Sequence, residues 1–261
     1  MPSDTSSNSN NPPRWKFRVR FAKSGDLRFV SHHDLMHVME RMFRRADLTL
    51  ATSQGFNPRP KMTFALSLGL GIAGLNEVLE MEAALPLGAE DVQARLTRQC
   101  PPGLRIHSVR AIDFKCSARV RRALYALPLL TPIDDLLERC QSFLAQSECW
   151  VERARPHPRR VNLRPFVDEL RSQADRLTMA LWITPNGAAR AEELIAALGL
   201  SALLEEGAVI ERTDLELCDE MPPGTSDPPV IRAAMLETTT NDEPLPVHRT
   251  AIMDNPMSFD S

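Results

Sequence analysis

WKFRVRF at residues 15–21 and SHHDLMHVMERMFRRA at residues 31–46 decide how the first half of this chain folds. Apolar and basic side chains alternate in the first stretch, which is typical of a half-buried β-strand. Ser31 is suited to be an N-cap, and Asp34 three residues later completes a capping box, so a helix is expected to begin there. Apolar side chains at helical spacing form its expected core face: Leu35, Val38, Met39, Met42, Phe43 and Ala46.

Further elements follow this strand and helix along the chain. Alternating and helical patterns predict strands at 62–68, 77–84 and 104–112 and a helix at 89–98. The resulting order, β-α-β-β-α-β, is that of a ferredoxin-like unit.

The second half repeats this order with weaker signals. Strands are expected at 120–129, 149–153, 176–184 and 209–217, helices at 133–146 and 189–198, and an extended insert at 161–170. We therefore predict an α+β fold of two tandem ferredoxin-like (βαββαβ) domains at residues 14–117 and 118–218. Residues 1–13 and 219–261 are polar or rich in Pro, Gly, Thr, Asp and Asn, and are predicted to be disordered tails.

Composition excludes several classes of protein. The chain has 261 residues, of which 43% are hydrophobic and 25% charged, as in ordinary globular proteins. No apolar run approaches the roughly 20 residues of a membrane helix, and the polar N-terminus is unlike a secretory signal. Five scattered cysteines lack C-x-x-C spacing, which argues against disulfides, structural zinc or a bound iron–sulfur cluster. We predict a cytoplasmic protein with no cofactor and no membrane partner.

Charge is divided unequally between the two halves. Residues 1–125 contain 19 Lys and Arg against 11 Asp and Glu, a net charge of +8, whereas residues 126–261 contain 12 against 23, a net charge of −11. A basic block of this kind suits RNA, DNA or a phosphorylated ligand, although charge runs are also common on solvated faces.

Two motifs with known chemistry have simpler interpretations here. Residues 69–74, GLGIAG, match G-x-G-x-x-G, but the alternating residues after them predict a strand, so a hairpin connection is favoured over a dinucleotide site. His33 and His37 lie one helical turn apart without an evident third metal ligand, and no metal site is predicted. Both share a helix face with Arg41 and Arg44, which is either simply solvated or contacts phosphate.

Residues 52–61, TSQGFNPRPK, form the most informative loop. Prolines stiffen the segment, Gln54 and Asn57 can read the edge of a base, and Phe56 can stack on one. Arg59 and Lys61 can meet phosphates. The alternative is a structural loop with Phe56 buried.

FVSHHDLM at residues 29–36, followed by SQGFNPRPK at residues 53–61, resembles the radical SAM-linked protein family. Weaker similarities at residues 162–165 and at Arg212-Thr213 extend the resemblance over roughly residues 15–217. The chain departs from the family pattern at His33, where Leu is usual, at His37, where Arg is usual, and at Asn162, where Asp is usual. These departures leave His32 as the candidate catalytic histidine.

The resemblance implies a bacterial protein that works with a radical SAM enzyme. Because this chain lacks the C-x3-C-x2-C run of such an enzyme, it is expected to be a separate partner that positions an RNA substrate. We therefore predict a non-catalytic RNA-binding accessory protein, with tRNA or rRNA as partner and no DNA specificity. The expected RNA and phosphate contacts are Lys16, Arg18, Arg20, His32, His33, Arg41, Gln54, Phe56, Asn57, Arg59 and Lys61.

Two alternatives remain open. The predicted fold also resembles RAMP-type endoribonucleases, in which metal-free cleavage needs a base and a cation. His32 with Arg59 or Lys61 could supply these groups. A protein–protein adaptor for a radical SAM partner, without RNA affinity, is the third hypothesis.

Overall fold

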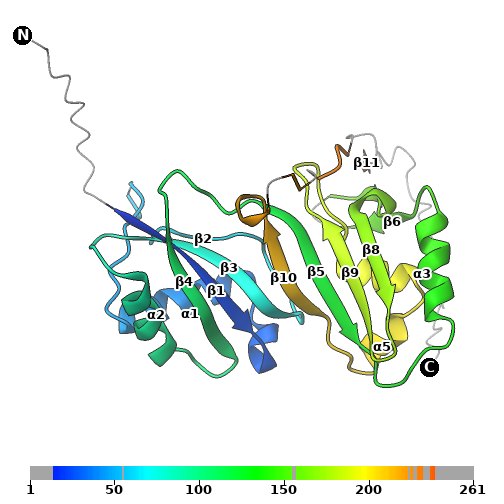
Figure 1. The fold of residues 1–261 in the computed structure, drawn as a ribbon, viewed down its shortest axis with the longest axis horizontal. Helices are drawn as coiled ribbons and strands as arrows, with labels where there is room; N and C mark the ends of the chain where they lie inside the picture. The colour runs from blue at the N-terminus through cyan, green and yellow to red at the C-terminus, as the bar shows by residue number, and fades with distance from the viewer. Residues whose placement is uncertain are drawn as a thin grey trace, which may run out of the picture.

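The structure is a computed structural model that describes residues 14–54, 56–154, 157–222, 224–225, 228–231 and 236–238. The described residues form an α+β fold with one large mixed sheet, which confirms the α+β part of the predicted fold class. Its strand order is β4-β1-β3-β10-β5-β9-β8, with β2 paired to β3. Figure 1 shows these strands side by side along the molecule, with α1 and α2 at one end and α3 at the other. The predicted N-terminal tail lies outside the described residues.

The first half contains the expected elements in the expected order. These are β1 (Trp15–Lys23), the 3-10 turn η1 (Gly25–Phe29), α1 (His32–Arg45), β2 (Met62–Phe64), β3 (Ala73–Ala83), α2 (Ala89–Arg98) and β4 (Leu104–Ile112). β3 and β4 both run antiparallel to β1. The glycine motif at residues 69–74 leads into β3, so a strand follows it as predicted.

The second half contains the predicted elements and, in addition, β7 and β8 in the expected insert, the helix α5 and the strand β11. Its elements are β5 (Val120–Pro128), α3 (Leu136–Ala145), β6 (Trp150–Arg153), β7 (Arg159–Asn162), the 3-10 turn η2 (Arg164–Phe166), β8 (Val167–Ser172), β9 (Arg176–Trp182), α4 (Ala191–Ala197), α5 (Ser201–Glu205), β10 (Glu211–Leu217), the 3-10 turn η3 (Cys218–Glu220) and β11 (Leu236–Thr238). β6 does not join the main sheet but forms a small sheet with β7 and β11. β8, from the region expected to be an insert, takes the place beside β9 because Val167 and Leu170 bury into the core.

β10 joins the two halves into one sheet. It pairs parallel with β3 through Glu211–Ala73 and Arg212–Gly74, and antiparallel with β5 on its other side. The fold also continues past the expected boundary at residue 218, since η3 packs on the sheet and Ile231 is buried. The tail prediction therefore begins too early.

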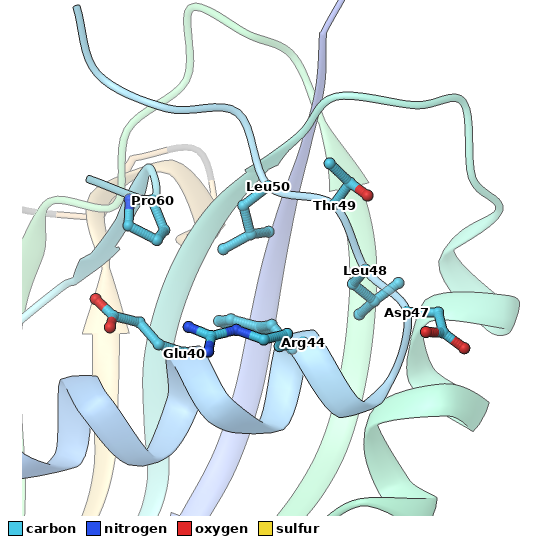
Figure 2. A pocket seen from close by; sticks show the side chains of 8 residues that line it. Glu40, Arg44, Asp47, Leu48, Thr49, Leu50 and Pro60 are labelled. Atoms are coloured by element: carbon cyan, nitrogen blue, oxygen red, sulfur yellow. The ribbon is translucent and has the colours of Figure 1, made fainter. Parts of the chain in front are cut away.

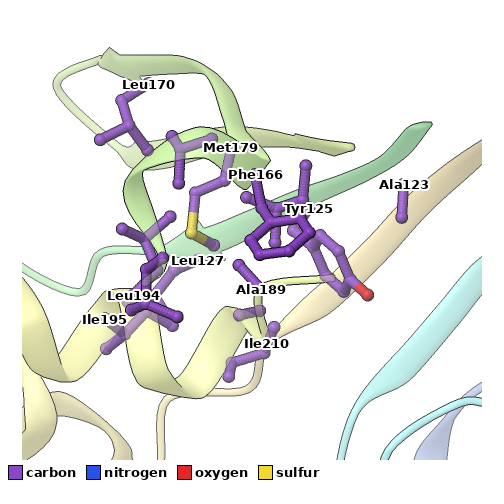
Figure 3. Packing of buried hydrophobic residues seen from close by; sticks show 14 of the residues in the cluster. Ala123, Tyr125, Leu127, Phe166, Leu170, Met179, Ala189, Leu194, Ile195 and Ile210 are labelled. Carbon is purple, nitrogen blue, oxygen red and sulfur yellow. The ribbon is translucent and has the colours of Figure 1, made fainter. Parts of the chain in front are cut away.

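Each half has its own hydrophobic core. In the first, Phe17, Val19 and Phe21 of β1 pack against residues of α1 and α2. In the second, residues of β5, β9, α3 and α4 pack together, and Figure 3 shows Tyr125, Leu127 and other side chains from the strands meeting α4. Among the described helices, none combines the length and the apolar character needed to span a membrane.

The alternation in β1 assigns its side chains to two faces. Since successive residues of a strand point to opposite faces, Lys16, Arg18 and Arg20 lie on the face away from α1 and α2. This orientation decides which basic residues can share a binding surface.

Candidate functional site

The N-terminus of α1 is fixed by a side-chain cap, as predicted. The backbone N–H of Asp34 donates to Ser31 Oγ at 3.2 Å, and the Ser31 hydroxyl donates to Asp34 Oδ2 at 2.7 Å. The carboxylate thus accepts from the hydroxyl that caps the helix. Both side chains have a structural role, which weakens the case for Ser31 or Asp34 as a ligand contact.

The outer face of α1 carries cationic and imidazole side chains. Leu35, Met39, Met42, Phe43 and Ala46 are buried, as expected for the core face, whereas Val38 is only partly buried. The exposed positions of α1 include His33, His37, Arg41 and Arg44, and also Asp34 and Arg45. Within the described part of the chain, neither Arg41 nor Arg44 has a carboxylate partner, so both guanidinium groups are available to an anion.

The two exposed histidines contact each other. Their ring centroids lie 4.6 Å apart, edge to face, and His37 Nδ1 lies 3.3 Å from Glu40 Oε2. The described residues contain no group of three or more His, Cys, Asp or Glu arranged to hold a metal ion.

Backbone hydrogen bonds hold the base of the 52–61 loop and leave its tip in solvent. Ser53 N–H donates to the Arg59 carbonyl at 2.9 Å, Arg59 N–H donates to Ser53 Oγ at 3.0 Å, and Lys61 N–H donates to the Ala51 carbonyl at 2.8 Å. Beyond this base the described side chains of Gln54, Phe56, Asn57 and Arg59 are exposed.

Phe56 is fully exposed, at 105% of its reference area. The alternative of a structural loop with a buried Phe56 is therefore wrong. A fully exposed aromatic ring at a loop tip gains nothing from the fold itself, and is available to stack on a ligand.

A cleft of about 350 Å³ lies between α1 and the base of this loop. Figure 2 shows Glu40 and Arg44 rising from α1 toward Leu50 and Pro60 on the opposite side. The lining mixes apolar and charged side chains, which suits a ligand with a planar apolar body and polar edges. α1 and the loop, separate in the sequence analysis, thus share one surface.

His32 and Lys61 are less available than the sequence suggested. The His32 ring packs edge to face on Phe64 with centroids 5.1 Å apart, and His32 is half-buried. Lys61 Nζ lies 3.3 Å from a Glu82 carboxylate oxygen. Arg59 remains an exposed cation at the loop, with no ion pair to any described residue.

The basic residues of β1 do not join this surface. Lys16 and Arg18 form ion pairs with Glu80, both at 2.8 Å, and Arg20 pairs with Asp214 at 2.8 Å. Because these side chains lie on the sheet face opposite α1, the single contact surface expected from the sequence is divided in two. Arg18 is buried and paired with carboxylates, so it is not exposed on this surface.

The acidic partners of β1 were missed in the sequence, although part of the signal was there. β3 alternates in the same way as β1, so that Glu80 and Glu82 stand opposite Arg18 and Lys16 in the antiparallel register. Two complementary alternating segments could have predicted this pairing. Asp219 and Glu220, about 200 residues away from β1, carried no such signal.

A buried ion pair at the junction of the two halves was also missed. Arg212 Nε donates to Glu77 Oε1 at 2.8 Å and Nη2 to Glu77 Oε2 at 2.5 Å, while Nη1 and Nη2 donate to the carbonyls of Ser67 and Leu66. Residue 74, next to this ion pair, must be glycine, since a Cβ at Gly74 would lie 2.5 Å from Glu77 Cγ. Arg212 is thus a structural residue of the sheet.

The fold and the surface together define an α+β protein with an exposed cationic helix beside an aromatic-tipped loop. Residues 16–193 match the family described as "Uncharacterized protein conserved in bacteria (DUF2344)", and the chain belongs to this family. A search of curated proteins found none that matches this chain. Among solved structures, the chain is similar to an unknown protein from Galdieria sulphuraria. The two are 15% identical, the match covers 78% of this chain and 99% of that one, and the TM-score is 0.25.

Proposed function

We propose that this protein is a non-catalytic RNA-binding accessory protein that works with a separate radical SAM enzyme in RNA modification or processing. The observation that carries the proposal is the set of exposed arginines on α1 and the adjoining loop, Arg41, Arg44 and Arg59. None of these three is paired with a carboxylate among the residues that the structure describes. Exposed, unpaired cations beside one another favour a phosphate backbone.

The neighbouring loop and cleft favour single-stranded RNA over a duplex. Phe56 offers a stacking platform, and the cleft between Arg44 and Pro60 can receive a base or sugar. The proposed binding surface comprises His33, Arg41, Arg44, Gln54, Phe56, Asn57 and Arg59, with His32 at its margin. Arg18 is excluded from it, and the radical SAM link rests on the resemblance of residues 29–36 and 53–61.

We further infer that the two halves are tandem ferredoxin-like units. Strand order β4-β1-β3-β2 in the first half and β10-β5-β9-β8 in the second supports this, since both place the first strand of the unit between its fourth and third.

A fluorescence anisotropy titration with labelled 20-nucleotide poly(U) tests the proposal. We expect binding that weakens as salt rises from 50 to 200 mM. Arg41→Ser with Arg44→Ser should weaken binding and make the plot of log K against log salt shallower by about 1.4, since each single-strand phosphate contact contributes about 0.7. The charge-matched control is Arg171→Ser with Arg176→Ser, two exposed arginines of the second half.

Binding that is absent at low salt, or equally weakened by the control pair, would overturn the proposal. The same samples test the endoribonuclease hypothesis, because RNA recovered intact after incubation without metal excludes cleavage of that RNA.

The adaptor hypothesis has one supporting observation. Phe29 and Leu70 are 58% and 67% exposed and line a mostly apolar groove of about 280 Å³ beside α5. An adaptor should form a stable complex with a radical SAM enzyme, measured by co-purification, while showing no salt-dependent RNA binding.

A further inference from the structure

Three arginines gather on the sheet face opposite α1. Arg18 and Arg20 come from β1, and Arg110 of β4 stands directly opposite Arg18 in the antiparallel register. Like charges placed opposite each other across a strand pair destabilise a sheet unless a counter-charge lies between them. The arrangement therefore requires an anion at this position.

Carboxylates of η3 supply that anion. Arg18 contacts Asp219 Oδ2 and Glu220 Oε1, both at 2.8 Å, and Arg20 Nη2 lies 2.5 Å from Glu220 Oε2. Glu220 also contacts Arg110. One carboxylate thus meets three guanidinium groups, as a phosphate group does in arginine clusters that bind nucleic acids.

η3 is attached to the sheet by the ion pairs of Asp219 and Glu220 and by one backbone hydrogen bond, from Cys218 N–H to the Arg119 carbonyl at 2.8 Å. It is a single turn of three residues, and none of them is buried. Burial of Arg18 opposes its charge, yet hydrogen bonds to Asp219, Glu220 and Glu80 outweigh burial and hold its pKa above the ordinary value. The Asp219 and Glu220 side chains can therefore leave the arginines without exposing a buried apolar side chain, and their ion pairs are what they would lose.

Removal of η3 would convert a neutral face into a basic one. Four basic side chains gather here, Lys16, Arg18, Arg20 and Arg110, against four acidic ones, Glu80, Asp214, Asp219 and Glu220. Asp219 and Glu220 are half of that negative charge. The remaining acidic groups belong to β3 and β10 and stay in place.

We propose that Arg18, Arg20 and Arg110 form a phosphate-binding site that Asp219 and Glu220 occupy in the free protein. RNA phosphates compete with the η3 carboxylates for these arginines, so that η3 acts as an intramolecular substitute for the ligand. This site lies on the opposite face of the sheet from α1. The inference deepens the proposed function and rests on it, because it assumes that RNA reaches this protein.

Neutralising η3 tests the site. Asp219→Asn with Glu220→Gln keeps the shape of both side chains and removes their charge. We expect about tenfold tighter binding of poly(U) at 50 mM salt, and a salt plot steeper by about 1.4 for two added phosphate contacts. Adding Arg110→Gln to this pair should remove part of the gain. Glu205→Gln with Glu206→Gln, which removes two negative charges from the end of α5, is the matched control and should leave binding unchanged.

Equal gains from the η3 pair and the control pair would reduce the effect to net charge and overturn the site. Unchanged affinity of a folded η3 variant would overturn it as well. Should the variant fail to fold, hydrogen exchange on the wild-type protein replaces it: poly(U) should speed amide exchange at residues 218–221 and slow it in β4, and no change there contradicts the proposal.

The two proposals fail in distinguishable ways. If Arg41→Ser with Arg44→Ser leaves poly(U) binding intact while the η3 variant gains affinity, the α1 surface is wrong and the η3 site stands. If the α1 pair weakens binding and the η3 variant gains no affinity, the α1 surface stands and the η3 site is wrong.

Inorganic tripolyphosphate, titrated calorimetrically into the η3 variant and the wild type, separates a site for phosphate from one that also needs bases. Tighter binding to the variant than to the wild type supports the phosphate site, and equal binding contradicts it.

Discussion

The two faces of the first half of the sheet use basic side chains in opposite ways. On the helical face, Arg41 and Arg44 of α1 are exposed, and no described carboxylate pairs with them. On the open face, Arg18 and Arg20 of β1 are each held by two or more carboxylates. Arginine thus has two roles on the two faces, paired with carboxylates on β1 and exposed without a described carboxylate partner on α1, and sequence composition alone does not separate them.

The difference teaches that a basic sequence block is a binding surface only where the fold leaves its charge uncompensated. Of the 11 Lys and Arg in residues 14–61, Lys16, Arg18 and Arg20 on β1 are compensated by carboxylates of β3, β10 and η3. The basic residues of β1 and of α1 contribute equally to the net charge of the segment. Of these two sets, however, only the α1 set, at Arg41 and Arg44, presents a positive charge to a polyanion without a paired carboxylate among the described residues.

The largest expected effect comes from removing a fully compensated arginine. The Arg212 and Glu77 side chains are only 2% and 3% exposed, so Arg212→Met leaves a buried carboxylate without its cation. We expect a loss of about 3–5 kcal/mol in the free energy of unfolding, measured by urea denaturation followed by circular dichroism.

A double variant sharpens this test. Glu77→Gln with Arg212→Met removes both charges and should recover part of the loss. A loss below about 1 kcal/mol for Arg212→Met would show that this pair is not a structural one, and would break the distinction between compensated and exposed arginines.

A smaller effect, on binding and not on stability, is expected at the loop beside the uncompensated face. Phe56→Ala should weaken poly(U) binding by about 1–3 kcal/mol, the range for loss of one base stacked on an aromatic ring. Stability should stay within about 0.5 kcal/mol, because the ring is fully exposed. Leu130→Ala, at an exposed apolar position of the second half, is the control and should leave binding unchanged. Equal losses in the two variants would mean that Phe56 has no special contact with RNA.

The parts of the fold that sequence predicted well are those set by neighbouring residues. The cap of α1 at Ser31, its core face and the two-sided alternation of β1 all follow from spacings within a few residues. Of the strands, β6 was assigned to the wrong sheet, because short strands with similar patterns compete and only packing against β9 selects β8.

The candidate site divides along the same line. Local chemistry singled out Gln54, Phe56, Asn57 and Arg59 but left burial of Phe56 open, whereas the burial and pairing of Arg18 depended on Asp219, 201 residues further along the chain. Local patterns can name a charged residue but cannot say whether a distant segment neutralises it. That is why the basic residues of β1 and α1 were predicted as one surface and are found on two.

The smallest expected effect concerns acid and the η3 contacts. Burial raises the pKa of Asp219 and Glu220, but hydrogen bonds to Arg18 outweigh burial and hold both pKa values below their ordinary range. A carboxyl whose pKa is lowered in the folded state contributes stability that is complete above its unfolded pKa, about 3.9 for Asp and 4.3 for Glu. This contribution disappears as pH falls through the lower, folded value.

Wild-type stability should therefore fall more steeply below about pH 4 than that of Asp219→Asn with Glu220→Gln, measured by thermal unfolding between pH 7 and pH 3. From pH 7 to pH 5 the plots of stability against pH for the wild type and the variant should run parallel, since Asp219 and Glu220 of the wild type stay ionised over this range. Glu216, whose pKa is lowered by Arg122, remains in both proteins, so its own acid loss cancels in the comparison. Parallel curves down to pH 3 would mean that the η3 carboxylates add no stability to the sheet. A phosphate could then displace these carboxylates from the arginines without destabilising the fold. The tighter poly(U) binding expected for Asp219→Asn with Glu220→Gln would then arise only because the carboxylates no longer compete with phosphate for the arginines.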